Sequence, residues 1–152
     1  MRRESARFQN TKISIGLVEG KGRSVFAEQD LEAGELIVSA PVLVLKGIEY
    51  YLLRIMPCIN HLFSWPRPKS QGGDTAAIAF GLASLCNHSE ANANATVVPN
   101  YEEECIDLVA TRAIEAGSQI LLRYKNPPPG LSEEPNIERI SAASRDSGIG
   151  KS

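Results

Sequence analysis

The chain has 152 residues, which at roughly 150 residues per domain predicts a single domain. Hydrophobic residues make up 43% of the chain and charged residues 22%, a composition that excludes collagen-like, coiled-coil and wholly disordered proteins. The net charge of −2 provides no general positive field, so we expect no direct contact with DNA or RNA.

The N-terminal part predicts two short strands joined by a glycine-rich turn. We expect residues 1–10 to be a flexible N-terminus. Apolar residues alternate with polar residues or glycine over 13–17, which is the period of a half-buried strand. The Gly-Lys-Gly-Arg segment at 20–23 is typical of a tight turn, and residues 24–27 after it predict a second strand.

The next part predicts further strands and then loses its pattern. Residues 31–35 form a predicted turn into strands at 36–38 and 41–45. The segment at 50–68 mixes aromatic residues with prolines, and we assign no element to it. Gln-Gly-Gly at 71–73 predicts a loop.

The following part predicts one helix and several strands. Asp74 and Thr75 are favourable N-cap residues, and the apolar run at 76–85 predicts a short buried helix after them. Residues 96–110 predict a hairpin, and the alternation at 120–124 predicts a last strand. One helix among many short strands predicts a mostly β (α+β) fold.

From residue 127 the chain is rich in serine and proline and has no aromatic residue. Such a segment cannot bury enough apolar surface to order itself, so we expect 127–152 to be a disordered tail. A helix at 137–143 would be too short to be stable alone, which restricts it to a state bound to a partner. The folded part is therefore predicted to end near Asn126.

The cysteine and hydropathy patterns favour an intracellular protein, cytoplasmic or nuclear. The chain has 3 cysteines and no Cys-x-x-Cys pair, which predicts neither a disulfide framework nor a four-cysteine zinc site. No apolar segment follows the basic N-terminal residues, and the longest nearly apolar run, 76–86, is far shorter than a membrane span. We therefore expect no export signal and no contact with a membrane.

Taken alone, the residues with chemical potential favour no particular site. The glycines of 20–22 lack the third glycine of a dinucleotide-binding loop, so they indicate either a tight turn or a loop that approaches a ligand. Cys58 and His61 with Cys86 and His88 are ligand types that zinc accepts, and Cys86 with His88 also suggests a nucleophile and base. Neither spacing is suitable, so we predict no metal and interpret Cys86 as a buried apolar residue.

In their order and spacing, three segments resemble the SET-domain protein lysine methyltransferases. The first is similar to the family's glycine loop, strand and Gly-Glu-x-Ile turn, the second contains its Asn-His-Ser motif, and the third leads into its C-terminal tyrosine. They lie at 21–37, 81–95 and 106–124. The resemblance covers residues 11–126, which we interpret as a SET domain.

The resemblance implies a β-clip fold of several small sheets, in which the last segment passes beneath a loop near Asn87 to form a pseudoknot. The chain is similar to small, single-domain members, because no cysteine-rich zinc module follows Tyr124. A lysine channel would then be completed by the middle segment or by a second subunit, as in a homodimer. The aromatic residues available for it are Tyr50, Tyr51, Phe63 and Trp65.

The resemblance also implies an activity, that of an S-adenosyl-L-methionine-dependent protein lysine N-methyltransferase. Tyr124 would be the catalytic residue at the methyl-transfer channel. Asn87 and His88 would bind the cofactor. They would do so together with the glycine loop, which consists of Gly20, Lys21, Gly22 and Arg23. The implied partner is a lysine-bearing protein, either a histone or another basic protein.

Departures from the family pattern keep a second interpretation open. Ser24 replaces a usual glycine, Cys86 an aromatic residue and Gln119 a glutamate, and Asn94 falls one residue late. The alternative is a catalytically silent SET-like module that binds a partner protein. The acidic residues at 102–104 are either a solvated turn or an attraction for a lysine-rich substrate segment.

Overall fold

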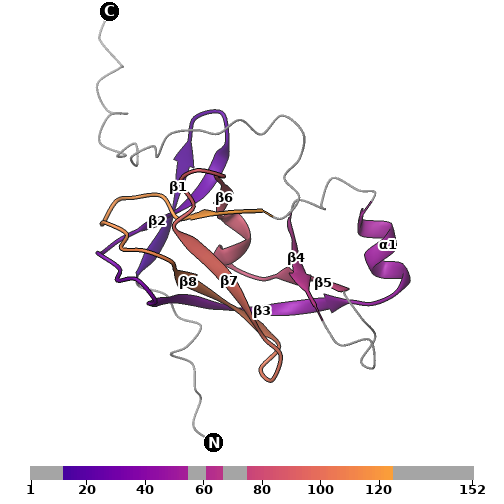
Figure 1. The fold of residues 1–152 in the computed structure, drawn as a ribbon. Helices are drawn as coiled ribbons and strands as arrows, with labels where there is room; N and C mark the ends of the chain where they lie inside the picture. The colour runs from indigo at the N-terminus through magenta and orange to yellow at the C-terminus, as the bar shows by residue number, and fades with distance from the viewer. Residues whose placement is uncertain (1–11, 55–60, 67–74, 125–152) are drawn as a thin grey trace, which may run out of the picture.

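The computed structural model describes residues 12–54, 61–66 and 75–124. The predicted flexible N-terminus, the loop at 71–73 and the tail with its helix lie outside these ranges. Within them the chain forms a two-stranded sheet, a seven-stranded sheet and two short helices (Figure 1), which confirms the mostly β fold. Neither helix of this part is long and apolar enough to cross a bilayer.

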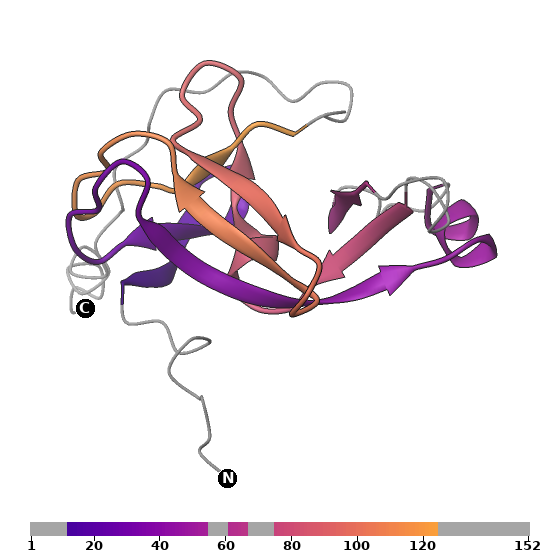
Figure 2. The ribbon, with the colours of Figure 1, turned by 60° about the horizontal axis from the view of Figure 1, so that its bottom comes forward.

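The seven-stranded sheet is strongly curled (Figure 2), and its strand order is β4-β5-β3-β8-β7-β9-β6. Its pairs are antiparallel except where β9 runs parallel to β6 and β7. The elements are β1 (Ile13–Val18), β2 (Gly22–Ala27), β3 (Leu36–Leu45), α1 (Ile48–Arg54), β4 (Leu62–Trp65), β5 (Thr75–Ala79), the 3-10 helix η3 (Leu82–Leu85), β6 (Asn87–His88), β7 (Ala95–Asn100), β8 (Cys105–Ala110) and β9 (Leu121–Leu122). Residues of both sheets, Val25, Leu108 and Leu122 among them, share one core.

The small sheet is the antiparallel hairpin of β1 and β2, as the alternation predicted. Gly16 on β1 lies against the ring of Phe26, which is fully buried, so that a Cβ at Gly16 would lie 2.6 Å from the ring carbon Cε2. Gly20 and Gly22 in the turn have φ angles of 75° and 80°, which residues with a side chain rarely adopt. The hairpin therefore needs glycine for close packing in the strand and for backbone conformation in the turn.

The predicted helix at 76–85 is wrong, because this segment forms β5 and then, after Gly81, the 3-10 helix η3. β5 lies between β3 and β4, and its Ala76, Ala77 and Ala79 are all buried. A strand covered on both faces has the same continuous apolar run as a buried helix, so the sequence pattern could not separate the two. The φ of 94° at Gly81 marks the change of direction.

Several other elements follow the prediction or complete it. The predicted hairpin at 96–110 is confirmed by β7 and β8. The strands predicted at 36–38 and 41–45 form the single strand β3, whose first half pairs with β8 and whose second half pairs with β5. The unassigned segment at 50–68 contributes the end of α1 and the strand β4.

The last strand, β9, lies between β6 and β7, two strands that precede it in the sequence. A loop, 89–94, joins β6 to β7, so the C-terminal segment passes between the two ends of this loop. Ser89 N donates to Leu122 O and Asn94 N donates to Leu121 O, each at 3.0 Å. The predicted last strand is shorter than expected, but it occupies the crossing that the resemblance implied.

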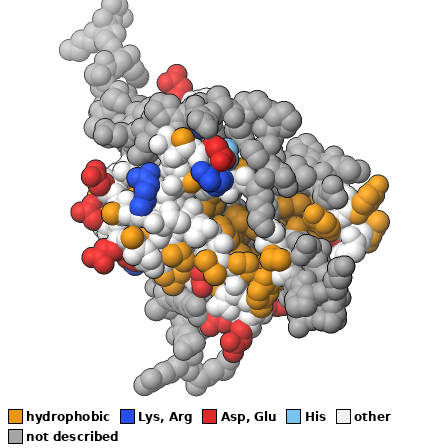
Figure 3. Space-filling model, viewed as in Figure 1, with side chains coloured by type: hydrophobic (Ala, Val, Ile, Leu, Met, Phe, Trp, Pro, Cys, Tyr) orange, Lys and Arg blue, Asp and Glu red, His pale blue; other side chains and the backbone are white. Residues whose placement is uncertain are grey.

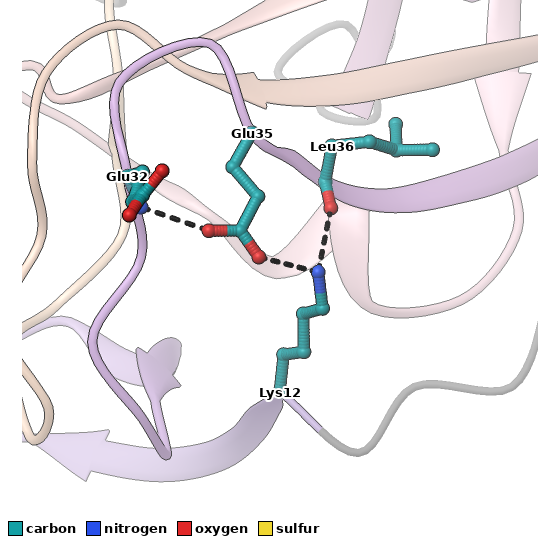
Figure 4. A network of polar contacts seen from close by, with 4 residues as sticks. All are labelled: Lys12, Glu32, Glu35 and Leu36. Carbon is teal, nitrogen blue, oxygen red and sulfur yellow. Dashed lines mark hydrogen bonds and ion pairs between the residues drawn. The ribbon is translucent and has the colours of Figure 1, made fainter.

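A polar clasp connects the start of β1 to the turn before β3 (Figure 4). Glu35 accepts a hydrogen bond from the backbone N of Glu32 at 2.8 Å and pairs with Lys12 Nζ at 2.5 Å. Lys12 Nζ also donates to the carbonyl oxygen of Leu36 at 3.3 Å. These bonds hold the pKa of the Glu35 carboxyl below its ordinary value of 4.5, mainly through Lys12 and then through the Glu32 amide.

Candidate functional site

Tyr124 is held at both its backbone and its side chain. Its amide N donates to His88 Nδ1 at 2.9 Å, and its hydroxyl donates to the carbonyl oxygen of Cys86 at 2.7 Å. The His88 and Tyr124 rings lie 5.1 Å apart, with 41° between their planes. β6 and β9 are parallel neighbours, so the crossing brings these two predicted site residues into direct contact.

The His88 ring binds the backbone of Tyr124. Its Nδ1 accepts a hydrogen bond and therefore carries no proton, which places the proton of the neutral ring on Nε2. The side chain is only 8% exposed. Since Nδ1 is already used within the chain, only Nε2 is left to face a ligand.

Burial makes ionisation of the Tyr124 and Cys86 side chains still less favourable than it is in water. It raises the pKa of the Tyr124 hydroxyl to about 12, with a smaller contribution from the Cys86 thiolate that would lie nearby. It also raises the pKa of the Cys86 thiol to about 12. Tyr124 is therefore a neutral dipole, and Cys86 lacks the thiolate that a nucleophile needs, in agreement with its interpretation as a buried apolar residue.

Buried, uncharged side chains connect β2 to the Asn-His pair. Gln119 Oε1 accepts hydrogen bonds from Ser24 Oγ at 2.7 Å and from Asn87 Nδ2 at 3.1 Å. Asn94 donates its Nδ2 to the backbone oxygen of Gln119 at 2.9 Å and accepts a bond from Leu121 N at 2.8 Å. Buried amides with several partners have little freedom to rotate, so this network sets the geometry around Asn87.

The glycine turn at 20–23 forms the end of the hairpin of β1 and β2. Gly20, Gly22 and Arg23 are exposed and Lys21 is half-buried. Ser24, the next residue, reaches Asn87 through Gln119, so the structure brings the end of the turn near the Asn-His pair. Binding of a ligand by the turn stays a prediction.

The aromatic residues expected to complete a lysine channel differ in their surroundings. Trp65 is fully buried and packs edge-on against Tyr101, with ring centroids 5.0 Å apart, so it belongs to the core. Tyr50 and Phe63 are half-buried. The ring in contact with Tyr124 is that of His88, and the channel role of the aromatic residues stays a prediction.

Tyr51, the fourth of these residues, lies on an apolar surface of α1. It is 62% exposed, and Ile48 and Leu52 on the same helix are also exposed. Hydrophobic side chains gather over α1 at the right of the molecule in Figure 3. Tyr51 thus offers a ring to solvent at the end of the curled sheet.

The zinc alternative is tested only in part. His61 is exposed, and Cys58 lies outside the described residues. Among the described residues, no three His, Cys, Asp or Glu side chains lie together in a way that could hold a metal ion. Cys86 and Cys105 are free, buried thiols.

Two arginines that the sequence analysis did not single out hold the loop at 89–94. Arg123 donates from Nη2 to Glu90 O at 2.6 Å, and its Nε lies 3.1 Å from Glu90 Oε1. Arg112 Nη2 donates to Asn92 O at 3.2 Å. These partners are 33 and 20 residues apart in sequence, so no local pattern could have predicted them. Exposed ion pairs contribute little stability, so we interpret these contacts as constraints on the loop at 89–94.

A curled sheet whose last strand passes between two earlier strands, and there brings a tyrosine against an Asn-His pair, is the architecture of a SET-type protein. The chain belongs to the SET-domain family: the family's sequence profile matches residues 22–125, which is more than half of the chain. Members of this family are typically protein lysine methyltransferases that use S-adenosylmethionine.

Solved structures share this fold. A Plasmodium falciparum protein described as a candidate histone methyltransferase has a TM-score of 0.58 and 22% identity, and the match covers 76% of this chain and 99% of that one. The polycomb repressive complex 2 of Chaetomium thermophilum gives a TM-score of 0.63 at 21% identity, covering 83% of this chain and 17% of that one. A humanised mutant of that complex, bound to the inhibitor GSK126, gives 0.55 at 21% identity, with coverage of 77% and 15%.

The chain therefore spans nearly the whole length of the Plasmodium protein and a small part of the two Chaetomium chains. At these identities the likeness shows the fold alone. A comparison with curated proteins finds no match.

Proposed function

We propose that this chain is an S-adenosylmethionine-dependent protein lysine N-methyltransferase. The observation that carries the proposal is the placement of Tyr124, whose backbone is held by His88 and whose hydroxyl is held by the Cys86 carbonyl. A tyrosine constrained in this way, in a SET-domain chain, is suited to orient a reacting group. Tyr124 is the catalytic residue of this proposal.

The residues present fit the cofactor. Asn87 offers a half-buried carboxamide with both a donor and an acceptor. A Cβ built at Gly20 or Gly22 would meet nothing within 4 Å, so the backbone of the turn is open to close approach. We assign cofactor binding to Asn87, to the turn formed by Gly20, Lys21, Gly22 and Arg23, and to the free Nε2 side of His88.

When bound, the cofactor supplies an electrophilic methyl group for direct displacement by the neutral amine of a substrate lysine. The Tyr124 hydroxyl donates a hydrogen bond to the Cys86 carbonyl, which leaves the lone pairs of its oxygen to accept a hydrogen bond from the amine and orient it. With its pKa at about 12, the hydroxyl stays protonated and acts as a fixed dipole. The buried surroundings of Tyr124 disfavour the charged ammonium form of lysine, so the ammonium gives a proton to solvent and reacts as the neutral amine.

The substrate is a lysine-bearing protein of the cytoplasm or nucleus, a histone or another basic protein. The turn between β7 and β8 supports this choice, because Glu102, Glu103 and Glu104 are exposed there and can attract a lysine-rich segment. This attraction weakens as the salt concentration rises, since exposed charges are screened.

Calorimetric titration with S-adenosylmethionine and with its demethylated product tests the proposal without a guess of the substrate. We expect dissociation constants of about 1 μM, equivalent to about −8 kcal/mol. Asn87→Ala is expected to bind at least about tenfold more weakly, which corresponds to the loss of one hydrogen bond. Ser39→Ala is the matched control, since Ser39 is a buried hydroxyl on β3 that bonds Asp107 outside the site.

The result also separates the two functional interpretations. A chain that binds both ligands is then tested for transfer of a labelled methyl group to lysine-rich proteins. Absence of binding near millimolar cofactor would contradict the proposal and favour the silent module that binds a partner protein.

A further inference from the structure

Gln119 occupies the point where three separate segments of the chain meet. Its backbone forms an isolated antiparallel bridge with Phe26 of β2, and its carbonyl oxygen accepts the side-chain amide of Asn94 at 2.9 Å. Its side-chain oxygen accepts both Ser24 Oγ and Asn87 Nδ2. The residue is only 3% exposed, so these bonds form away from solvent.

The bond to Gln119 decides which way the Asn87 carboxamide faces. An amide group carries its oxygen and its nitrogen on opposite branches of one plane, and rotation by half a turn exchanges them. Because Asn87 Nδ2 donates to an acceptor oxygen, Oδ1 must lie on the opposite side of the group. Without that acceptor the two orientations would compete, and the orientation that presents the wrong atom to a ligand would become populated.

Ser24 holds the acceptor itself in place. Its hydroxyl donates to the same Gln119 oxygen at 2.7 Å, and Ser24 is fully buried on β2 directly after the glycine turn. Ser24, Gln119 and Asn87 are all uncharged, so the network needs no counter-ion in the protein interior. Two residues that depart from the family pattern, Ser24 and Gln119, are thus bonded to each other.

We propose that Gln119 is a positioning residue that orients the Asn87 carboxamide for cofactor binding and links it through Ser24 to the strand after the glycine turn. This inference rests on the proposed function, because the ligand assigned to Asn87 is S-adenosylmethionine. Gln119 acts through Asn87 and through the oxygen that both neighbours share.

Gln119→Met is the variant that tests this role, because methionine has a similar length but neither of the amide groups. We expect the dissociation constant for S-adenosylmethionine to rise about tenfold, the equivalent of one oriented hydrogen bond. Gln119→Glu keeps acceptor oxygens for both donors and is expected to restore affinity to within about threefold. Ser39→Ala, which removes a buried hydroxyl bond elsewhere, should lower the unfolding midpoint and leave the dissociation constant unchanged.

A second measurement keeps this test separate from that of the proposed function. In ligand-free protein, NMR exchange of the Asn87 side-chain amide protons with water should be slow in the wild type and fast in Gln119→Met. If the wild type binds no cofactor, the proposed function fails, and the exchange rates still report on the positioning. Unchanged exchange in folded Gln119→Met, or unchanged affinity where the wild type binds, would overturn the inference. If Gln119→Met does not fold, the affinity of Gln119→Glu tests the inference instead. A folded Gln119→Glu variant that binds the cofactor tenfold more weakly than the wild type would also overturn the inference.

Discussion

At the scale of single residues, the candidate site depends on the contact between His88 and Tyr124. Tyr124 makes two hydrogen bonds within the chain: its backbone N donates to Nδ1 of His88, and its hydroxyl donates to the carbonyl oxygen of Cys86. The sequence analysis assigned His88 to the cofactor, which stays a prediction, and the structure adds a contact between its Nδ1 and the backbone of Tyr124. Because the bond to His88 comes from the backbone of Tyr124, removal of the Tyr124 hydroxyl should alter methyl transfer and change the fold little.

Tyr124→Phe keeps the ring contact with His88 and the backbone bond, and it loses only the bond from the hydroxyl to Cys86 O. We expect a loss of about 1 kcal/mol in unfolding free energy. Methyl transfer should slow by about tenfold to a thousandfold, or change in the number of methyl groups added, because a fixed dipole at the reacting amine is removed. Denaturant titration and a single-turnover transfer assay with mass analysis measure the two effects.

The control for this prediction is Tyr101→Phe. Tyr101 also donates its hydroxyl to a backbone carbonyl, that of Pro66 at 2.5 Å, but it lies against Trp65 in another part of the molecule. Its replacement should leave transfer unchanged. Equal rates for Tyr124→Phe and the wild type, with the same product, would remove Tyr124 from the catalytic role.

At the scale of elements, the hairpin of β1 and β2 depends on one close approach. Gly16→Ala would place a methyl group 2.6 Å from the buried ring of Phe26, so either the ring or the strand must move. Overpacking of this kind is expected to lower the unfolding free energy by about 1–3 kcal/mol. Leu17→Ala on the same strand is the control, because Leu17 is 53% exposed and its replacement should cost less. Equal stability of Gly16→Ala and the wild type in urea would contradict the prediction, because it would show that β1 or the Phe26 ring moves at no cost.

The polar clasp between Lys12 and Glu35 predicts that the free energy of unfolding depends on pH. The pKa of Glu35 is lower in the folded chain than its ordinary value of 4.5, so ionisation of Glu35 stabilises the fold above that pH. The contribution is lost as the pH falls through the folded pKa. We therefore expect Glu35→Gln to be less stable than the wild type at pH 7, and the difference to shrink as the pH falls below 4.5. Urea unfolding of both proteins across this range measures it, and a difference independent of pH would contradict the role of the charge.

At the scale of the whole molecule, the candidate site depends on the position of β9 between β6 and β7. The crossing places Tyr124 beside His88, 36 residues earlier in the sequence, and Gln119 beside Ser24, 95 residues earlier. Pairings over such separations require most of the chain to be ordered at once, because the entropy of closing the intervening loops must be offset by the contacts they allow. The candidate site is therefore a property of the complete crossing.

The sequence by itself predicted the elements that depend on local signals. The glycine turn of β1 and β2, the hairpin of β7 and β8 and the mostly β fold follow from alternation and turn residues, which act over a few neighbours. The order of the three motif segments predicted the family, and the match over residues 22–125 confirms it. These features need no knowledge of distant partners.

Tertiary structure alone decided the rest. The apolar segment at 76–79 is a strand and not a helix because its backbone pairs with β3 at one edge and with β4 at the other. The run of alanines would look the same in a buried helix and in a buried strand. The use of His88 to hold Tyr124, and the shared oxygen of Gln119, were likewise set by the crossing. Periodicity indicates the type of an element, whereas its buried face and the partner of a buried polar group depend on the strands that the fold brings beside it, as the exposure of Ile15 and Leu17 on β1 shows.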